Sequence, residues 1–138
     1  MACRNGTTTE GSAIVNHFFD RSFLVERLRL SLRQSYRLIG SSRSGLVSSE
    51  EIVRLLNRSR RGIENPYSYV PSDIMREEEI VAIPELAESG VTVYQLRAWM
   101  RRTRNVCPHF RLNGHTRRIP RALFIGWLAK NSKVLRRS

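Results

Sequence analysis

Apolar residues recur at helical spacing over the first third of the chain. From Ala13 to about Ile39 they return every three or four positions, with one longer step of seven. Gly40 ends the pattern, and Ser41–Gly45 has the composition of a loop. We therefore expect one helix here. Residues 1–12 are small and polar and predict a disordered arm.

A second helix is predicted to begin near Ser48. Ser48 and Glu51 have the spacing of a capping box, in which each side chain accepts the backbone N–H of the other residue. The apolar pattern ends at Arg60–Gly62. Residues 63–73 contain two prolines and predict a linker.

Short apolar runs alternate with turn signals from residue 74 onward. Met75–Glu79 fits either a short helix or a charged segment that leads into the next element. Ile80–Ile83 is a short apolar run rich in β-branched residues, which predicts a strand. Pro84–Glu88 predicts a short helix, because proline is tolerated in a first helical turn. Ser89-Gly90 ends that helix.

A longer helix and a hairpin follow. Thr92 and Gln95 form a second capping box, which predicts a helix from Val93 to about Arg102. The extended segments Pro108–Leu112 and His115–Pro120 flank Asn113-Gly114, a dipeptide typical of tight hairpin turns. A last helix is expected from Arg121.

The predicted order of elements indicates a winged helix-turn-helix. It consists of a strand, a short helix, a turn, a longer helix, a basic hairpin and a final helix. We therefore expect a mainly α fold with a small β-hairpin wing, preceded by an N-terminal helical segment. The predicted division is an arm over 1–12, a helical segment over 13–62, a linker over 63–73 and a winged domain over 74–138. The helical segment either supports the winged domain or, as its broad apolar face favours, forms a homodimer.

The charge of the chain is concentrated in its last fifty residues. The net charge is +12. Residues 1–88 hold twelve arginines and twelve acidic residues, whereas residues 89–138 hold twelve basic residues and no acid. Arginine supplies 22 of the 24 basic residues; coding bias accounts for part of that choice, but not for the missing acids. A field of one sign over a folded region suits phosphates.

The predicted DNA contacts fall on the longer helix and the hairpin. The start of the helix would face base edges and its end the phosphate backbone, while the hairpin would reach an adjacent groove. Trp99 and Trp127 are expected to be core residues, and Tyr94 fits DNA contact and core cover equally. The predicted set is Thr92, Tyr94, Gln95, Arg97, Arg101, Arg102, Arg104, Arg111, Asn113, His115, Arg117 and Arg118.

Residues of about 80–130 resemble the excisionase and MerR-type winged helix-turn-helix family, which includes AlpA-like prophage regulators. The resemblance rests on IPELAESGVTVYQLRAWMRR and HFRLNGHTRRIPRALFIGWL. The matching positions are Leu96, Arg97 and Trp99 in the recognition helix, Gly114, Arg117 and Arg118 in the wing, and Trp127 and Leu128 in the last helix. The resemblance implies a small DNA-binding domain that bends DNA for excision or regulates promoters.

These observations predict a sequence-specific double-stranded DNA-binding protein, a transcriptional regulator of a bacterium, phage or mobile element. The alternatives are an excisionase-like DNA-bending factor, an RNA-binding module and a protein-interaction adaptor. Expected partners are duplex DNA and a second copy of the chain, with a recombinase or RNA polymerase according to role. The target sequence stays open.

Other functional classes find little support in the sequence. Cys107, His109 and His115 lack a fourth ligand, so we expect no metal site. No carboxylate follows Glu88 and no phosphate-binding glycine loop occurs, so we expect neither an enzyme nor a cofactor. Two cysteines make no disulfide scaffold, and no leader or membrane-spanning run is evident. We therefore expect a cytoplasmic, nucleoid-associated protein.

Overall fold

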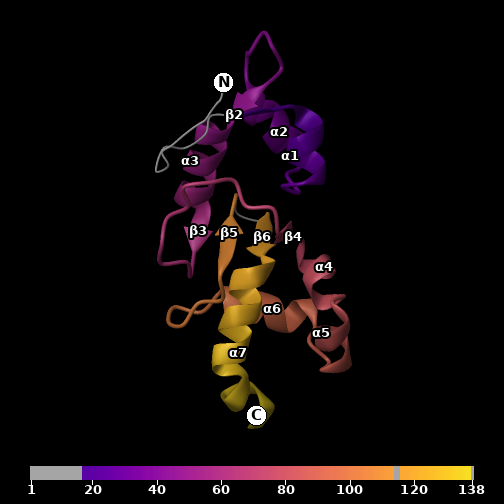
Figure 1. Cartoon of the computed structure of the whole chain (residues 1–138). Helices are drawn as coiled ribbons and strands as arrows, with labels where there is room; N and C mark the ends of the chain where they lie inside the picture. Colours follow the sequence, from indigo (N-terminus) through magenta and orange to yellow (C-terminus); the bar gives the residue numbers. More distant parts are fainter. Residues whose placement is uncertain (1–16, 114–115, 138) are drawn as a thin grey trace, which may run out of the picture.

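A computed structural model describes residues 17–113 and 116–137, which leaves the predicted arm outside the described residues. The N-terminal helices lie at one end, a four-stranded sheet lies in the middle, and the C-terminal helices lie at the other end (Figure 1). The elements in chain order are β1 (Phe18–Phe19), α1 (Arg21–Glu26), α2 (Leu32–Ile39), β2 (Val47–Ser48), α3 (Ser49–Ser59), β3 (Arg60–Arg61), β4 (Ile74–Met75), α4 (Glu77–Val81), α5 (Pro84–Glu88), α6 (Val93–Met100), β5 (His109–Arg111), β6 (Arg117–Pro120) and α7 (Arg121–Arg137).

The single N-terminal helix predicted from the sequence is wrong. Its described part forms β1, α1 and α2, and Asp20 and Ser31 cap the two helices. Between the helices Arg29 adopts a positive φ of 59°. This turn lets Leu28 and Leu30 both enter the core, at 1% exposure each, which a continuous helix could not do for positions two apart.

The predicted linker, residues 63–73, packs against the rest of the protein. Ile63, Tyr67 and Val70 lie against the N-terminal core. Asn57 holds this segment, because its Nδ2 donates to the Tyr67 carbonyl at 2.9 Å and its Oδ1 accepts the Tyr67 N–H at 2.7 Å. The two prolines therefore mark an ordered connection and not a free one.

The predicted strand Ile80–Ile83 is also wrong, because its first two residues end helix α4 and the other two lie in the turn that follows. The Glu79 carboxylate accepts the backbone N–H of Arg76 at 2.7 Å and so caps the start of the helix. Three consecutive glutamates occupy its first turn, where negative charge favours the helix dipole. Of the two alternatives for Met75–Glu79, the helix holds from Glu77 onward, whereas Met75 belongs to strand β4.

The remaining predicted elements are confirmed. Helix α3 begins after Ser48, whose hydroxyl accepts the Glu51 N–H at 3.3 Å. Pro84 opens α5, and Thr92 and Gln95 form the predicted capping box of α6. Strands β5 and β6 pair as the predicted hairpin, and α7 begins at Arg121.

The hairpin is the centre of a sheet and not a free wing. The strand order is β3-β5-β6-β4, with every pair antiparallel. Strand β3 comes directly from α3, and β4 comes just before α4. The predicted isolated hairpin is therefore corrected to a mixed arrangement of helices and small antiparallel sheets.

The sheet separates two hydrophobic cores. The N-terminal core is formed by Leu24, Leu28, Leu30, Val47, Ile52, Leu56, Ile74 and Phe110. The C-terminal core is formed by Ile80, Ile83, Leu86, Leu96, Met100, Cys107, Ile119, Phe124 and Trp127. Because the hairpin contributes Phe110 to one core and Ile119 to the other, it joins the two halves of the molecule. The predicted domain boundaries stay a prediction.

Candidate nucleic-acid interface

A basic pocket lies between the end of α6 and the sheet. Its volume is about 380 Å³. It is lined by Arg61, Gly62, Met100, Arg101, Arg102, Val106, His109, Arg111 and Arg117. We call it the arginine pocket. Five of its lining residues are arginines and none is acidic.

The strand register places four of these side chains on one face of the sheet. Arg61 is the partner of His109 across β3 and β5, and Arg111 is the partner of Arg117 across β5 and β6. Directly opposed residues share a face, and so do residues two apart on one strand. His109 and Arg111 are two apart. The sheet therefore gathers all four side chains on the pocket side.

The loop after α6 brings Arg101 and Arg102 to the same pocket. Asn105 fixes this loop to α7, because its Oδ1 accepts the Trp127 indole N–H at 3.0 Å and its Nδ2 donates to Asn131 Oδ1 at 2.7 Å. The Arg102 guanidinium lies 5.8 Å from the centre of the Trp127 ring. The loop is thus anchored by its own side chains.

Gly62 permits the close approach that brings β3 to this site. Its φ is +68°, and a Cβ built there would lie 2.4 Å from the Val106 carbonyl oxygen. Any other residue would push Arg61 away from the loop that follows α6. The position therefore requires glycine for both backbone conformation and space.

The charge of the arginine pocket is not neutralised by carboxylates. Within the part of the chain that the structure describes, ion pairs join Arg29 to Glu79, Arg54 to Glu50 and Arg97 to Glu77, and none involves a pocket arginine. The directly opposed pair on β5 and β6 adds repulsion, since like charges facing each other across strands destabilise a sheet. The pocket therefore attracts anions.

His109 forms a buried part of the pocket wall. It is 2% exposed, and its Nδ1 lies 2.7 Å from the Cys107 carbonyl oxygen. A carbonyl only accepts hydrogen bonds, so Nδ1 carries the proton in the neutral ring. Burial lowers the pKa of His109, and the charges of Arg117, Arg61 and Arg111 lower it further, against the opposing effect of the Cys107 bond. The ring is therefore neutral at pH 7.

The start of α6 presents some of the predicted contacts to solvent. Tyr94 is 79% exposed, which favours a contact role over core cover. Thr92 and Gln95 are exposed and cap each other: Gln95 Oε1 accepts the Thr92 N–H at 3.0 Å, and Thr92 Oγ1 accepts the Gln95 N–H at 3.1 Å. The capping bond uses the oxygen of the Gln95 amide and leaves its NH₂ group as a donor.

Arg97 is placed differently from the prediction of a base contact. Its Nε and Nη2 donate to the two carboxylate oxygens of Glu77 at 3.1 and 3.2 Å. Glu77 is nearly buried, at 8% exposure. The guanidinium is therefore turned toward α4, where it compensates a buried carboxylate.

Arg118 also departs from its predicted place in a wing. Its Nε donates to the Arg29 carbonyl and its Nη1 to the Arg117 carbonyl. Burial lowers the pKa of Arg118, with a further lowering by Arg76. Arg118 thus ties the sheet to the N-terminal half, because it lies on the face opposite Arg117.

The outer end of the hairpin lies against the N-terminal core. Leu112 packs on that core, and Asn113 Oδ1 accepts the Thr116 N–H at 2.9 Å. Arg104 is exposed in the loop after α6. The predicted contact His115 lies outside the described residues. Leu112 therefore does not project freely as a residue of a predicted wing would, because it packs on the N-terminal core.

Trp127 is a core residue, as predicted, whereas Trp99 is partly buried and packs against the same core. Trp127 is 9% exposed, and its ring centre lies 5.6 Å from that of Trp99. Trp127 also stacks on Phe124 at 6.2 Å.

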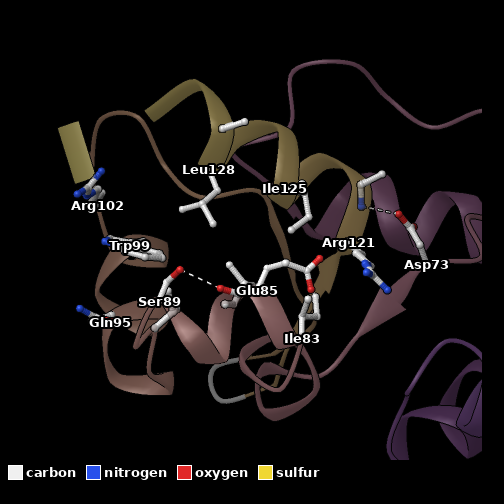
Figure 2. Close-up of a pocket in the computed structure, with 14 residues that line it drawn as sticks. Asp73, Ile83, Glu85, Ser89, Gln95, Trp99, Arg102, Arg121, Ile125 and Leu128 are labelled. Carbon is white, nitrogen blue, oxygen red and sulfur yellow. Dashed lines mark hydrogen bonds between the residues drawn. The ribbon is translucent and has the colours of Figure 1, made fainter. Parts of the chain in front are cut away.

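A larger groove, of about 1250 Å³, lies between α5, α6 and α7 (Figure 2). Ile83, Ile125 and Leu128 give it apolar walls, and the Ala122 N–H donates to Asp73 Oδ2 at 2.8 Å beside it. Its charged lining residues carry both signs, namely Asp73, Glu85, Arg102 and Arg121. This groove therefore lacks the one-sign field that distinguishes the arginine pocket.

Within residues 17–113 and 116–137, no group of three or more His, Cys, Asp or Glu side chains gathers as metal ligands would. Burial raises the pKa of the Cys107 thiol to about 12, which disfavours a thiolate. No helix in these ranges combines the length and apolarity needed to cross a bilayer.

The chain has no match among protein-family models, curated proteins or solved structures. The arginine pocket and the exposed start of α6 are the features of the structure that bear on function.

Proposed function

We propose that this protein binds double-stranded DNA in a sequence-specific manner through α6 and the arginine pocket. The observation that carries the proposal is the pocket itself, in which five arginines and no acid surround the end of a capped helix. A polyanion compensates such a cluster, and backbone phosphates are the commonest anions that arginines of this kind contact.

The dimensions of α6 support major-groove binding. An α-helix with its side chains is about 10–12 Å across, which fits a major groove about 12 Å wide, and the eight residues of α6 give about 12 Å of helix to lie in it. Thr92, Tyr94 and Gln95 would face base edges, and the Gln95 NH₂ offers a donor to them. Arg101 and Arg102, at the far end, would then lie beside the backbone.

The order of α5, turn and α6 supports a helix-turn-helix mode of binding. Gly90 has a φ of +77° and forms the turn between the two helices. Together with the resemblance of residues 80–130 to excisionase and MerR-type regulators, this favours a DNA-binding regulator of a bacterium, phage or mobile element. An excisionase-like role would use the same contacts.

The proposal is tested by selecting bound sequences from a random duplex pool at physiological salt. The wild type is expected to yield a defined motif. Gln95→Met removes the amide donor but keeps a good helix former, so it should lose about tenfold or more of the discrimination at one position. Gln34→Met is the matched control, because Gln34 has the same capping position on α2.

Two results would contradict the proposal. One is an unchanged motif in Gln95→Met, which would remove α6 from base recognition. The other is duplex RNA of equal length competing as well as duplex DNA, because the deep, narrow major groove of A-form RNA excludes a helix.

A further inference from the structure

We propose that the arginine pocket seats one phosphate group of the DNA backbone, which Arg61 grips together with Arg101 and Arg117 beside His109. This assignment rests on the proposed DNA binding and extends the interface to β3, in the half of the chain that carries no net charge. The sequence offers no sign of it, because Arg61 lies within an apparent helix end.

The pocket has the donors that a phosphate group requires. Guanidinium groups reach it from three strands and from the end of α6. A guanidinium can donate two parallel hydrogen bonds to one phosphate, and a phosphodiester presents only acceptors. The volume of about 380 Å³ suits a small group and not a whole nucleotide chain.

The strand pairing keeps these like charges together at a cost. Arg111 faces Arg117 directly, and Gly62 presses Arg61 against the loop after α6. Within the described residues no carboxylate forms an ion pair with any of them. A phosphate bound among these arginines would attract each of them and so offset their mutual repulsion. Phosphate binding therefore gives a reason for the clustered charges.

His109 is a group in the site whose protonation would be coupled to phosphate binding. Because Nδ1 donates to the Cys107 carbonyl, Nε2 is the acceptor in the neutral ring, and it has no hydrogen-bond partner among the described residues. Protonation of Nε2 would add a donor for the phosphate. Burial opposes this protonation most, followed by the guanidiniums of Arg117, Arg61 and Arg111; Arg101 and Arg102 are the other charged residues that line the pocket. A bound phosphate offsets these charges, so DNA binding should take up a proton at His109.

The first test measures the affinity of the full-length protein for a duplex of about 20 base pairs as a function of salt concentration. Arg61→Gln is expected to weaken binding about tenfold and to reduce the log–log salt slope by about 0.9. Arg43→Gln removes the same charge from the exposed turn between α2 and β2 and should leave both values near the wild type. Urea unfolding establishes that both variants are folded.

The second test follows the histidine ring signals by NMR during pH titration. Adding the duplex should raise the pKa of His109. Inorganic phosphate at matched concentration should produce a smaller rise, and duplex DNA added afterwards should displace it and give the larger, duplex-bound rise.

The outcomes separate this assignment from the proposed function. One outcome is that the wild type binds duplex DNA with a steep salt dependence while Arg61→Gln and Arg43→Gln have the same affinity and salt slope. This outcome would overturn the pocket assignment and leave DNA binding intact. Absence of duplex binding by the wild type would overturn the proposed function. If inorganic phosphate then still raised the pKa of His109, the pocket would belong to a free phosphorylated ligand, and the backbone assignment would fall.

Discussion

Arg117 and Arg118 occupy successive positions on β6 and therefore point to opposite faces of the sheet. Arg117 faces the arginine pocket, whereas Arg118 shares the face of Phe110 and bonds the Arg29 carbonyl. The alternation could be predicted from the sequence once a strand was assigned. Which of the two arginines faces the ligand could not, because that depends on where α6 and the N-terminal half pack.

The two arginines are expected to respond oppositely to truncation. Arg118→Ala should lower the free energy of unfolding by about 1–3 kcal/mol, because it leaves a partly buried carbonyl without its donor. Arg117→Ala should leave stability within about 0.5 kcal/mol or raise it, since a repulsive pair is removed, but should weaken DNA binding. Urea unfolding and duplex affinity measure both effects. Equal stability loss in the two variants would contradict the assigned faces.

His109 should make stability depend on pH in the mildly acidic range. Its pKa is lowered in the folded protein from an ordinary value of 6.5, so the folded state binds fewer protons than the unfolded chain. The stability that neutral His109 contributes is therefore present above about pH 6.5 and is lost as the pH falls through the folded pKa. Between pH 7.5 and 5.5 the wild type should lose more stability than His109→Gln.

The matched control for this pH effect is His17→Gln, because His17 is exposed. That variant should follow the wild-type dependence of unfolding free energy on pH. If His109→Gln followed it as well, the buried ring would not be the titrating group, and the charge of the pocket would have been misjudged.

Strand β3 shows how a two-residue element can position a site. It places Arg61 opposite His109, and Gly62 then allows the chain to pass close to Val106. Gly62→Ala should destabilise the protein by more than the roughly 1–2 kcal/mol expected for a positive φ alone, because its Cβ meets backbone. It should also weaken DNA binding by displacing Arg61.

Gly45 provides the control for that prediction. Its φ of +71° is similar, but a Cβ there would meet nothing within 4 Å. Gly45→Ala should show only the conformational cost in a urea unfolding experiment and should bind DNA normally. Equal stability loss at the two glycines would mean that the close approach at Gly62 has no energetic weight.

The elements with local stop and start signals were predictable from the sequence. Helices α3, α5 and α6 have caps or a first-turn proline, and the hairpin has its turn dipeptide. Strand β3 was missed because its pairing partner lies nearly fifty residues away, and two residues leave no pattern. The start of helix α4 was one of two predicted alternatives. Its end was missed because β-branched Ile80 and Val81 favour a strand locally, while the capping carboxylate precedes them.

At the scale of the whole molecule, the sheet makes the two halves depend on each other. Phe110 is fully buried in the N-terminal core although it belongs to the predicted winged domain. A fragment of residues 74–138 would expose this ring, at a cost of about 1.5–3 kcal/mol. It would also lack β3 and so expose the edge of β5 that pairs with β3. The fragment is expected to unfold at lower temperature and less cooperatively than the full chain, as followed by circular dichroism. An unchanged transition would support an independent C-terminal domain.

The distribution of charge along the chain could be predicted from the sequence, but the set of arginines that gathers on one surface of the folded protein could not. Six arginines, namely Arg61, Arg101, Arg102, Arg104, Arg111 and Arg117, line the arginine pocket or its adjoining loop. Arg97 and Arg118 were equally plausible contacts until the fold assigned them to Glu77 and to the Arg29 carbonyl. Tertiary pairing therefore decided which charges remain available to a ligand.

The salt dependence of duplex DNA binding by the wild-type protein tests the central claim most directly. If the interface neutralises about six phosphates, one of them in the arginine pocket, the logarithm of the association constant should fall with the logarithm of salt concentration at a slope of about −5. Fluorescence anisotropy with a labelled duplex gives this slope. A slope near zero, or no saturable binding at low salt, would contradict the account.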